Sequence, residues 1–368
     1  MKTIFYYMHV PWNWIKQRPH FIAEKLSNFY NINVFCPEPL IDFHKKLVNN
    51  KNTLKNLNII NLLKIPLSRK INILNKIETF YNKSILNNYI NQSDIIWLTA
   101  PENFNVILKY VKNQKIVYDC MDDFLEFPAI KNNEILYKKY FELEKLLVNK
   151  CDLIICSSKY LKYKLINKYN IVEQKISIIN NAIELNEEKT NYFTQQIQQY
   201  YDLEYLKMAY VGTISKWFDF DLILESIEKY QNICYYLFGP TEVSIPKNNR
   251  IKYFGSKNHS EIFRIMSEAD ALIMPFLPNE LVYSINPVKL YEYIYCCKPI
   301  LCLKYPETER FENYVYLYKE HSEYLEYINK LNDKKLELKQ DKNQYINFVL
   351  SNTWDYRIKN IIESLNLL

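Results

Sequence analysis

The chain of 368 residues is long enough for two domains of ordinary size. Its content of 48% hydrophobic and 15% aromatic residues excludes an intrinsically disordered protein. The net charge of +6 comes from 47 basic and 41 acidic residues mixed along the chain, whereas nucleic-acid-binding proteins cluster their basic residues, so we expect no nucleic-acid partner.

The cysteines and histidines give no pattern of a metal site. None of the eight cysteines forms a C-x-x-C pair and the five histidines stand apart from them, so we expect neither a metal nor a cofactor. Most cysteines fall in or beside apolar runs, which is typical of reduced thiols in the cytosol. The apolar N-terminus is too short for a signal peptide and no run approaches 18 apolar residues, so we expect a cytoplasmic protein without a membrane span.

In the first half of the chain, short apolar runs alternate with amphipathic stretches. We predict strands at residues 4–9, 32–35, 59–62, 95–98, 115–118 and 153–156. We predict helices at residues 18–29, 71–90, 104–111, 134–149 and 159–168. Alternation of this kind indicates a parallel sheet with helices on both faces.

A second series follows a polar segment, at about 180–202, that we interpret as a linker. Its predicted strands are 207–211, 233–238, 250–254, 271–274 and 299–303, and its predicted helices are 220–230, 260–267, 287–296 and 322–331. The tail, 341–368, is predicted to be helical with a break near 352–353. The sequence therefore predicts two Rossmann-like, doubly wound α/β domains facing across a cleft, at 1–185 and 186–350, followed by a C-terminal helix at 351–368.

The predicted helix start after strand 271–274 is the first candidate site. Asn286 is a suitable N-cap and Pro287 fits the first helical position, so free N–H groups and the helix dipole favour a phosphate there. Lys289 in the first turn disfavours the helix unless an anion neutralises it. Glu292, on the same face, suits sugar hydroxyls such as a ribose diol. The alternative is an ordinary surface ion pair between Lys289 and Glu292.

The loop after the first predicted strand is the second candidate. It carries aromatic rings and hydrogen-bond donors that suit an acceptor sugar or a polyprenyl diphosphate. These residues are His9, Trp12, Trp14, Arg18 and His20. As alternatives, the two tryptophans fill the domain core and His20 caps or packs the helix.

Three acidic residues after predicted strand 115–118 form the third candidate. Asp122 or Asp123 is a candidate general base for an acceptor hydroxyl, whereas the strand direction predicts that Asp119 is buried. The alternative is that these residues are acidic N-caps of the next helix.

Taken in order, these segments resemble GT-B-fold glycosyltransferases, in particular the teichuronic-acid, capsule and lipopolysaccharide glycosyltransferases of the family 4-like type. The pattern P-x-K-x-x-E-Y at 287–293, followed by C-K-P-I at 297–300, carries most of the resemblance. Further matches lie at 12–20, 118–123, 210–219, 238–240, 254–255 and 269–276. Two positions depart from the family pattern, since Ser284 replaces a frequent acidic residue and Cys297 replaces a glycine.

The resemblance implies roles for individual residues. Lys289 would bind the donor diphosphate and Glu292 the ribose, at the helix start marked by Asn286. Gly212, Thr213 and Lys216 would approach the phosphate or sugar, and Phe254 with Gly255 would lodge the base. The segment 354–357 resembles a closing helix that crosses back to the first domain.

The resemblance implies a metal-independent glycosyltransferase that moves a sugar from a UDP- or GDP-sugar to a saccharide or polyprenyl-linked acceptor. We expect a role in bacterial surface polysaccharide biosynthesis, with peripheral association at the cytoplasmic face of the inner membrane. Two alternatives stay open. One is a nucleotide-sugar epimerase of the same fold, and the other is a non-catalytic nucleotide- or sugar-binding module, which would not need Asp122 or Asp123.

Overall fold

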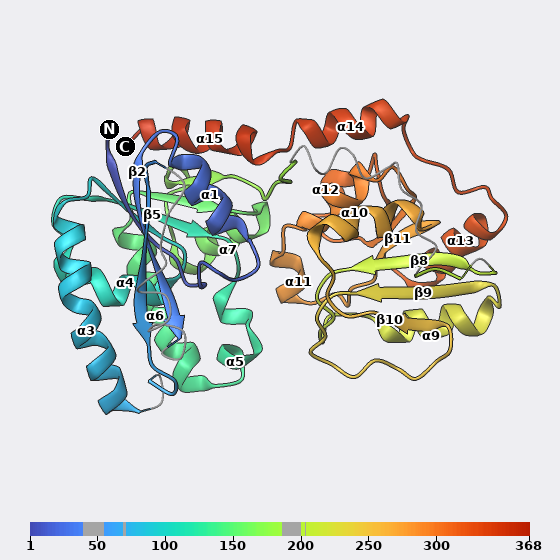
Figure 1. The fold of residues 1–368 in the computed structure, drawn as a ribbon, viewed down its shortest axis with the longest axis horizontal. Coiled ribbons are helices and arrows are strands. Elements are labelled where there is room, and N and C mark those ends of the chain that lie inside the picture. The colour runs from blue at the N-terminus through green and yellow to red at the C-terminus, as the bar shows by residue number, and fades with distance from the viewer. Residues whose placement is uncertain (40–54, 69–70, 186–199, 203) are drawn as a thin grey trace. The chain divides into compact units, whose positions relative to one another are not determined.

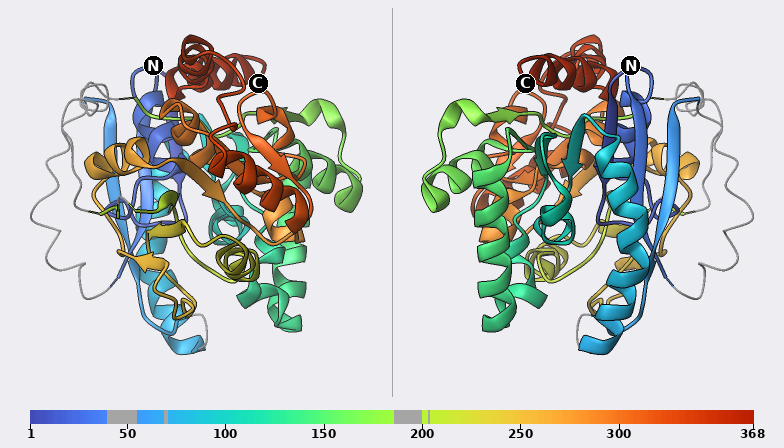
Figure 2. Two further views of the ribbon diagram at one scale, coloured as in Figure 1. Left: turned by 90° about the vertical axis from the view of Figure 1, so that its right-hand side faces the viewer. Right: turned by 90° about the vertical axis from the view of Figure 1, so that its left-hand side faces the viewer.

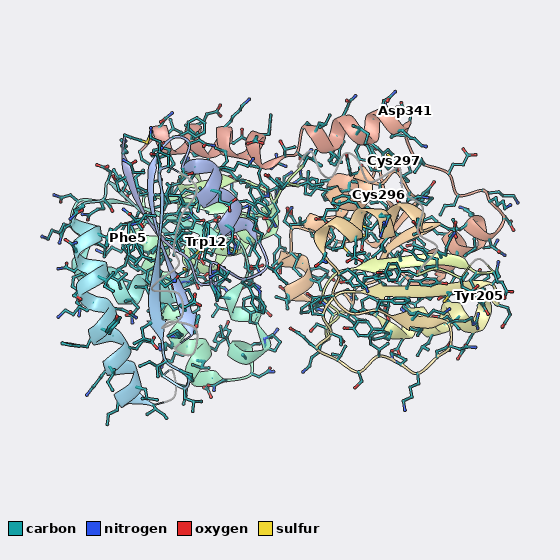
Figure 3. All side chains as sticks on the ribbon, in the orientation of Figure 1. Phe5, Trp12, Tyr205, Cys296, Cys297 and Asp341 are labelled. Carbon is teal, nitrogen blue, oxygen red and sulfur yellow. The ribbon has the colours of Figure 1, made fainter. Side chains whose placement is uncertain are left out.

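The computed structural model describes residues 1–39, 55–68, 71–185, 200–202 and 204–368. It divides into two compact units, residues 1–180 with 354–368, and residues 181–353 (Figure 1). Each unit is built around one parallel sheet with helices packed against it, and side chains fill the space between sheet and helices (Figure 3). The predicted fold class, two doubly wound α/β units, is therefore confirmed.

Unit 1 contains a seven-stranded parallel sheet in the order β3-β2-β1-β4-β5-β6-β7. Its strands are β1 Thr3–Tyr7, β2 Asn31–Pro39, β3 Leu57–Lys64, β4 Ile95–Leu98, β5 Lys115–Cys120, β6 Leu153–Cys156 and β7 Ile176–Ile178. Its helices are α1 Arg18–Leu26, α3 Asn72–Asn91, α4 Pro101–Ile107, α5 Pro128–Lys131, α6 Glu134–Lys150, α7 Lys159–Tyr169 and α15 Trp354–Asn366. The strand order reverses direction between β1 and β4, which in a doubly wound sheet is where ligands bind.

Unit 2 repeats this arrangement with a six-stranded parallel sheet in the order β10-β9-β8-β11-β12-β13. Its strands are β8 Leu206–Val211, β9 Ile233–Phe238, β10 Ile251–Tyr253, β11 Ala271–Met274, β12 Ile300–Leu303 and β13 Tyr316–Tyr318. Its helices are α9 Phe220–Lys229, α10 His259–Glu268, α11 Glu280–Ser284, α12 Val288–Tyr295, α13 His321–Asn332 and α14 Lys342–Leu350. Here the order reverses between β8 and β11.

The predicted strands and long helices are all present, with ends that differ by a few residues. The sequence reading missed β7, β13, α5 and α11, which have three to five residues each and are too short to show a period. The predicted helix 104–111 is instead α4 followed by a short 3-10 helix, Leu108–Tyr110. Most of the predicted linker lies outside the described residues.

The chain passes between the units at 180/181 and at 353/354, whereas the sequence predicts boundaries at 185/186 and 350/351. Local hydrogen bonds account for this division. The Asn180 amide donates to the Ser157 carbonyl of unit 1 at 2.8 Å, whereas the Asn181 amide donates to the Asn286 carbonyl of unit 2 at 3.0 Å. In α15, Trp354 stacks on Phe21 of α1 with ring centroids 5.4 Å apart, so the last helix belongs to unit 1.

Candidate functional site

In unit 1, polar side chains gather where the central strands end. His9 follows β1 and its Nδ1 lies 2.8 Å from the Thr99 hydroxyl, which follows β4. The His9 ring also meets the edge of Phe124, after β5, at a centroid distance of 5.5 Å. These residues surround the point where the strand order reverses, so a ligand of unit 1 is expected there.

Asp119 is completely buried, as the strand direction predicted. Its carboxylate pairs with Arg18, at 2.9 Å from Nε and 2.8 Å from Nη2. Arg18 also donates to the Ile179 carbonyl at 2.7 Å, and its side chain is only 4% exposed. We therefore do not retain Arg18 as an acceptor contact, because its guanidinium is bonded inside unit 1.

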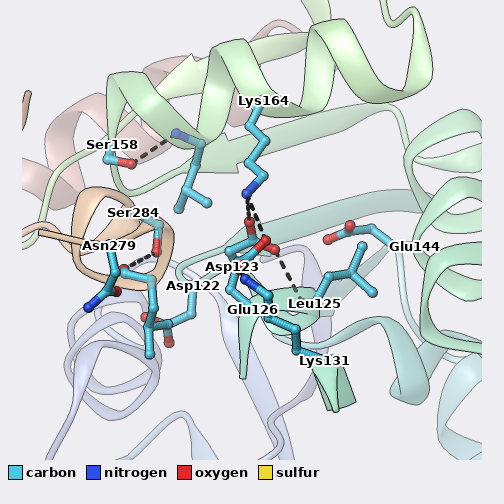
Figure 4. A network of polar contacts seen from close by, with 12 residues as sticks. Asp122, Asp123, Leu125, Glu126, Lys131, Glu144, Ser158, Lys164, Asn279 and Ser284 are labelled. Carbon is cyan, nitrogen blue, oxygen red and sulfur yellow. Dashed lines mark hydrogen bonds and ion pairs between the residues drawn. The ribbon is translucent and has the colours of Figure 1, made fainter. Parts of the chain in front are cut away.

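Asp123 also forms bonds within unit 1. It caps the short 3-10 helix Phe124–Glu126 by accepting from the Leu125 N–H at 3.2 Å. Its other oxygen lies 2.7 Å from Lys164 of α7, which also pairs with Glu126 at 3.3 Å (Figure 4). The alternative of an acidic cap thus describes Asp123, whose two carboxylate oxygens are bonded to a backbone N–H and to a lysine.

Asp122 differs from both of its acidic neighbours. Within the described residues, its half-buried carboxylate has no hydrogen bond or ion pair (Figure 4). Burial raises its pKa, Arg18 lowers it, and the charges of Asp119 and Asp123 raise it further, to about 6. A carboxylate with a pKa near neutrality and free oxygens is suited to general base catalysis.

The tryptophan loop has one buried end and one exposed end. The Trp12 ring lies 5.3 Å from the ring of His20, which is 1% exposed. His20 accepts the Gln17 N–H on Nδ1 at 3.1 Å, and its Nε2 lies 3.2 Å from the Pro11 carbonyl, so it caps α1. Trp14 is 60% exposed, which is incompatible with a core position and leaves its ring free to contact an acceptor.

In unit 2, the only three glycines of the chain meet where β8, β9 and β10 end. The Gly212 N–H donates to the Phe238 carbonyl and the Gly239 N–H to the Gly255 carbonyl, at 2.9 and 2.8 Å. Gly239 has a φ of +134°, and a Cβ there would lie 2.0 Å from the Gly212 carbonyl oxygen. A side chain is therefore excluded at Gly239. We call the strand ends that carry these three residues the glycine edge; because they bear no side chains, the backbone there can approach a ligand closely.

The loop that follows Gly212 is tied across the strand-order reversal to the loop after β11. The Asp219 N–H donates to the Pro275 carbonyl at 2.9 Å, and the Leu277 N–H donates to the Trp217 carbonyl at 2.7 Å. Thr213 accepts from the Tyr210 hydroxyl through its carbonyl at 2.8 Å. Lys216 is exposed in this loop.

The helix start after β11 differs from the prediction in its cap. Helix α12 begins at Val288 with Pro287 as N-cap, so Asn286 lies one residue too early to cap it. The Asn286 side chain, 2% exposed, instead accepts the Asn181 N–H at 2.9 Å and donates to Glu307 at 3.0 Å. Sequence reasoning missed Glu307, since an acidic residue after β12 gives no sign that it is buried.

Lys289 and Glu292 form an ion pair at 2.7 Å, with side chains 34% and 8% exposed. The alternative of an ion pair is thus present, and the half-buried Lys289 remains compatible with diphosphate binding as well. Tyr293, on the same helix, fixes α12 to the glycine edge. Its hydroxyl accepts the Val211 N–H at 2.9 Å, which places α12 beside the residue that precedes Gly212.

The predicted base site is lined with aromatic rings. Phe254 stacks on Phe238 at 5.1 Å and meets Tyr200 edge-on at 5.4 Å. Gly255 has a φ of +65°, a left-handed conformation that favours glycine. The base-binding role of Phe254 and Gly255 stays a prediction.

Among the residues that the structure describes, no group of three or more His, Cys, Asp or Glu side chains is placed to hold a metal ion. No helix of the described part is both long and apolar enough to cross a membrane.

No protein-family model matches the chain. A Bacillus subtilis (strain 168) protein named as a teichuronic acid biosynthesis glycosyltransferase, TuaH, is 23% identical over 244 residues, covering 63% of this chain and 61% of that protein. An uncharacterised 41.2 kDa protein of the Klebsiella pneumoniae cps region is 25% identical over 173 residues, covering 45% of this chain and 46% of that protein. The aligned parts thus span between 46% and 61% of these relatives.

Solved structures match over nearly the whole chain. Anabaena Alr3699/HepE in complex with UDP has a TM-score of 0.69 at 12% identity and covers 100% of both chains. An Escherichia coli structure bound with UDP-2-fluoro glucose has a TM-score of 0.72 at 10% identity and covers 98% of this chain and 99% of its own. The lipopolysaccharide outer core galactosyltransferase WaaB has a TM-score of 0.60 at 11% identity, covering 99% of both. The chain therefore has the GT-B fold of these proteins and is similar in sequence to a protein named as a teichuronic acid biosynthesis glycosyltransferase.

Proposed function

We propose that this protein is a glycosyltransferase that moves a sugar from a nucleoside diphosphate to an acceptor hydroxyl. The observation that carries the proposal is the meeting, in unit 2, of the glycine edge with α12, where Tyr293 bonds to Val211 at 2.9 Å. Backbone without side chains beside α12, which carries the half-buried Lys289 in its first turn, suits a diphosphate. Lys289 would contact the diphosphate, and Glu292 the ribose.

In the proposed reaction, Asp122 of unit 1 accepts the proton of the acceptor hydroxyl. The acceptor oxygen forms a bond to the anomeric carbon while the bond from that carbon to the diphosphate oxygen breaks. The electron pair leaves with the nucleoside diphosphate, whose charge Lys289 and the N–H groups of α12 stabilise. A divalent ion is not needed in this scheme.

The proposed classes of donor and acceptor are supported by the proteins to which this chain is similar. The HepE structures contain UDP and UDP-glucose, which favours a UDP-sugar over a GDP-sugar. The name of the Bacillus relative and the cps region of the Klebsiella relative favour surface polysaccharide biosynthesis. We propose a saccharide or polyprenyl-linked acceptor, with His9, Trp12 and Trp14 as contacts, used at the cytoplasmic face of the membrane.

Thermal unfolding with UDP, GDP and CMP, followed by nucleotide release from sugar donors with and without acceptors, tests the proposal. We expect UDP to raise the melting temperature, and release to require both an acceptor and Asp122. The variant Asp122→Asn should lose release, whereas Asp355→Asn, with a side chain 71% exposed on α15, should keep it.

Each other outcome contradicts the proposal in a different way. Conversion of the donor sugar without transfer would indicate an epimerase. Nucleotide binding without turnover on any acceptor, unchanged by Asp122→Asn, would indicate a binding module. If no nucleotide raised the melting temperature, the proposed donor site itself would be contradicted.

A further inference from the structure

Helix α3 of unit 1 carries apolar side chains on the side that faces away from the sheet. Ile73, Ile77 and Phe80 are 69%, 52% and 82% exposed, and Tyr81 is 45% exposed. Their spacing of three, four and seven residues places them in one stripe of the helix. We call these four residues the α3 outer face; in Figure 2, right, α3 lies at the front of unit 1.

The orientation of α3 is fixed by its opposite side. Asn82 is 7% exposed, and its amide accepts the Leu63 N–H and donates to the Leu63 carbonyl of β3, both at 3.0 Å. Leu86 and Ile90 are fully buried on this side. Rotation of the helix cannot bury the α3 outer face without breaking these bonds, so its exposure belongs to the folded unit.

The charges beside the α3 outer face are positive. Lys76 and Lys83 are exposed one turn or less from its apolar residues. Glu78 is the one acidic residue of α3. Its carboxylate forms an ion pair with Lys64 at 2.8 Å and accepts a hydrogen bond from the Ile65 N–H at 2.9 Å. Neither lysine forms an ion pair with a residue that the structure describes, so the α3 outer face is flanked by positive charge and is complementary to an anionic surface with an apolar interior.

We propose that the α3 outer face binds a bilayer containing anionic lipid, with Ile73, Ile77 and Phe80 in the acyl boundary and both lysines at the headgroups. A second copy of the chain fits less well. A stable protein interface uses about 20–30 residues a side, far more than this stripe offers, and paired α3 helices would bring like charges together. The α3 outer face would thus be the surface through which the proposed membrane association takes place.

The test is co-sedimentation of the full chain with vesicles of equal parts phosphatidylglycerol and phosphatidylcholine, compared with pure phosphatidylcholine. We expect binding to the anionic vesicles that weakens as salt is raised. The variant Ile73→Ser with Phe80→Ser should lower the partition coefficient about tenfold or more, because the apolar area that enters the bilayer is lost. Lys76→Glu with Lys83→Glu should lower it by a similar factor on anionic vesicles.

The matched control is Ile135→Ser with Val172→Ser, since these residues are 82% and 66% exposed in unit 1 but lie outside the α3 outer face. Equal binding by the control and the α3 variants would overturn the proposal. So would a dimer in sedimentation equilibrium that the α3 variants convert to monomer. The assay measures binding and not transfer, so this proposal and the transferase proposal can fail separately.

Discussion

The carboxylate of Asp122 is the group on which the proposed chemistry depends, because Asp119 and Asp123 are bonded to Arg18 and Lys164. Only the ionised form of Asp122 can accept a proton. With its pKa raised to about 6, we expect kcat/KM to fall roughly tenfold per pH unit below that value. A pH profile measures this, with UDP stabilisation followed over the same range to separate chemistry from binding. A profile that is flat between pH 5 and pH 8 would be inconsistent with this role.

The same raised pKa has a consequence for stability. A carboxyl group with a pKa of about 6 in the fold and about 3.9 in the unfolded chain binds its proton more tightly when folded. Its contribution to stability is therefore present at low pH and is lost as pH rises from about 4 to about 6.

We expect Asp122→Asn to raise the free energy of unfolding at pH 7.5 by on the order of 1–3 kcal/mol, and by less at pH 5. Urea denaturation at the two pH values measures the difference. A variant that is destabilised equally at both would show that Asp122 has structural partners.

Glu307 is a positioning residue in unit 2. It is 3% exposed and accepts from the Asn286 amide at 3.0 Å, two residues before α12. Glu307→Ala leaves that buried amide without this partner, which costs about 1–3 kcal/mol of stability and loosens the helix start. We expect a higher donor KM with a smaller change in kcat. Glu307→Gln keeps an acceptor oxygen and should restore most of the donor affinity, which a purely electrostatic role would not allow.

At the scale of elements, His321 links α13 to the start of α9. Its Nδ1 lies 2.6 Å from Glu225 and its Nε2 lies 3.1 Å from Asp219, the N-cap of α9. Burial alone would lower the pKa of His321, but these two carboxylates raise it above its ordinary value.

A histidine with a raised pKa stabilises the fold below its unfolded pKa of about 6.5, and this stability is lost as pH rises through the folded pKa. We expect His321→Gln to lower the melting temperature at pH 6 and to change it little at pH 9. Because the side chain is 41% exposed, the effect should be below about 1 kcal/mol. An equal loss at both pH values would mean that the contact acts without charge.

Elements were predictable where a pattern could repeat. The strands β4 and β9 are visible as continuous apolar runs and the helices α6 and α9 by their amphipathic period, whereas three-residue edge strands such as β7 show neither signal. The predicted N-cap of α12 was wrong for another reason. Asn286 has the right side chain for an N-cap, but its tertiary bonds to Asn181 and Glu307 take precedence, and local sequence carries no sign of them.

In the candidate site, too, local patterns were predictable from the sequence whereas contacts between distant residues were not. Gly212 and Asp122 follow the ends of β8 and β5, as the chain order predicts, whereas the roles of these residues and of Lys289 stay predictions. Burial was harder to predict for charged groups. Arg18 looked like a free donor in the sequence because its partner Asp119 is 101 residues away. Pairing across that distance decides whether an arginine serves a ligand or the fold.

At the scale of the whole molecule, the proposal excludes a catalytic metal, because Lys289 and α12 would stabilise the leaving diphosphate. We expect nucleotide release to be unchanged by EDTA and not to be raised by added Mg²⁺ or Mn²⁺ after dialysis. Lys289→Ala should lower kcat/KM by about two orders of magnitude. Recovery of the dialysed enzyme by a divalent ion would contradict the charge assignment.

The passage of the chain out of unit 1 and back into it sets an order of folding during synthesis. Unit 2 is one continuous segment, residues 181–353, so all of it is synthesised before α15 is made. Unit 1 cannot complete its core until Trp354 reaches Phe21 and Arg18, over three hundred residues earlier in the chain. The domain translated first is therefore the last to finish, and its exposed α1 surface is where a chaperone would be needed while the second domain is still emerging.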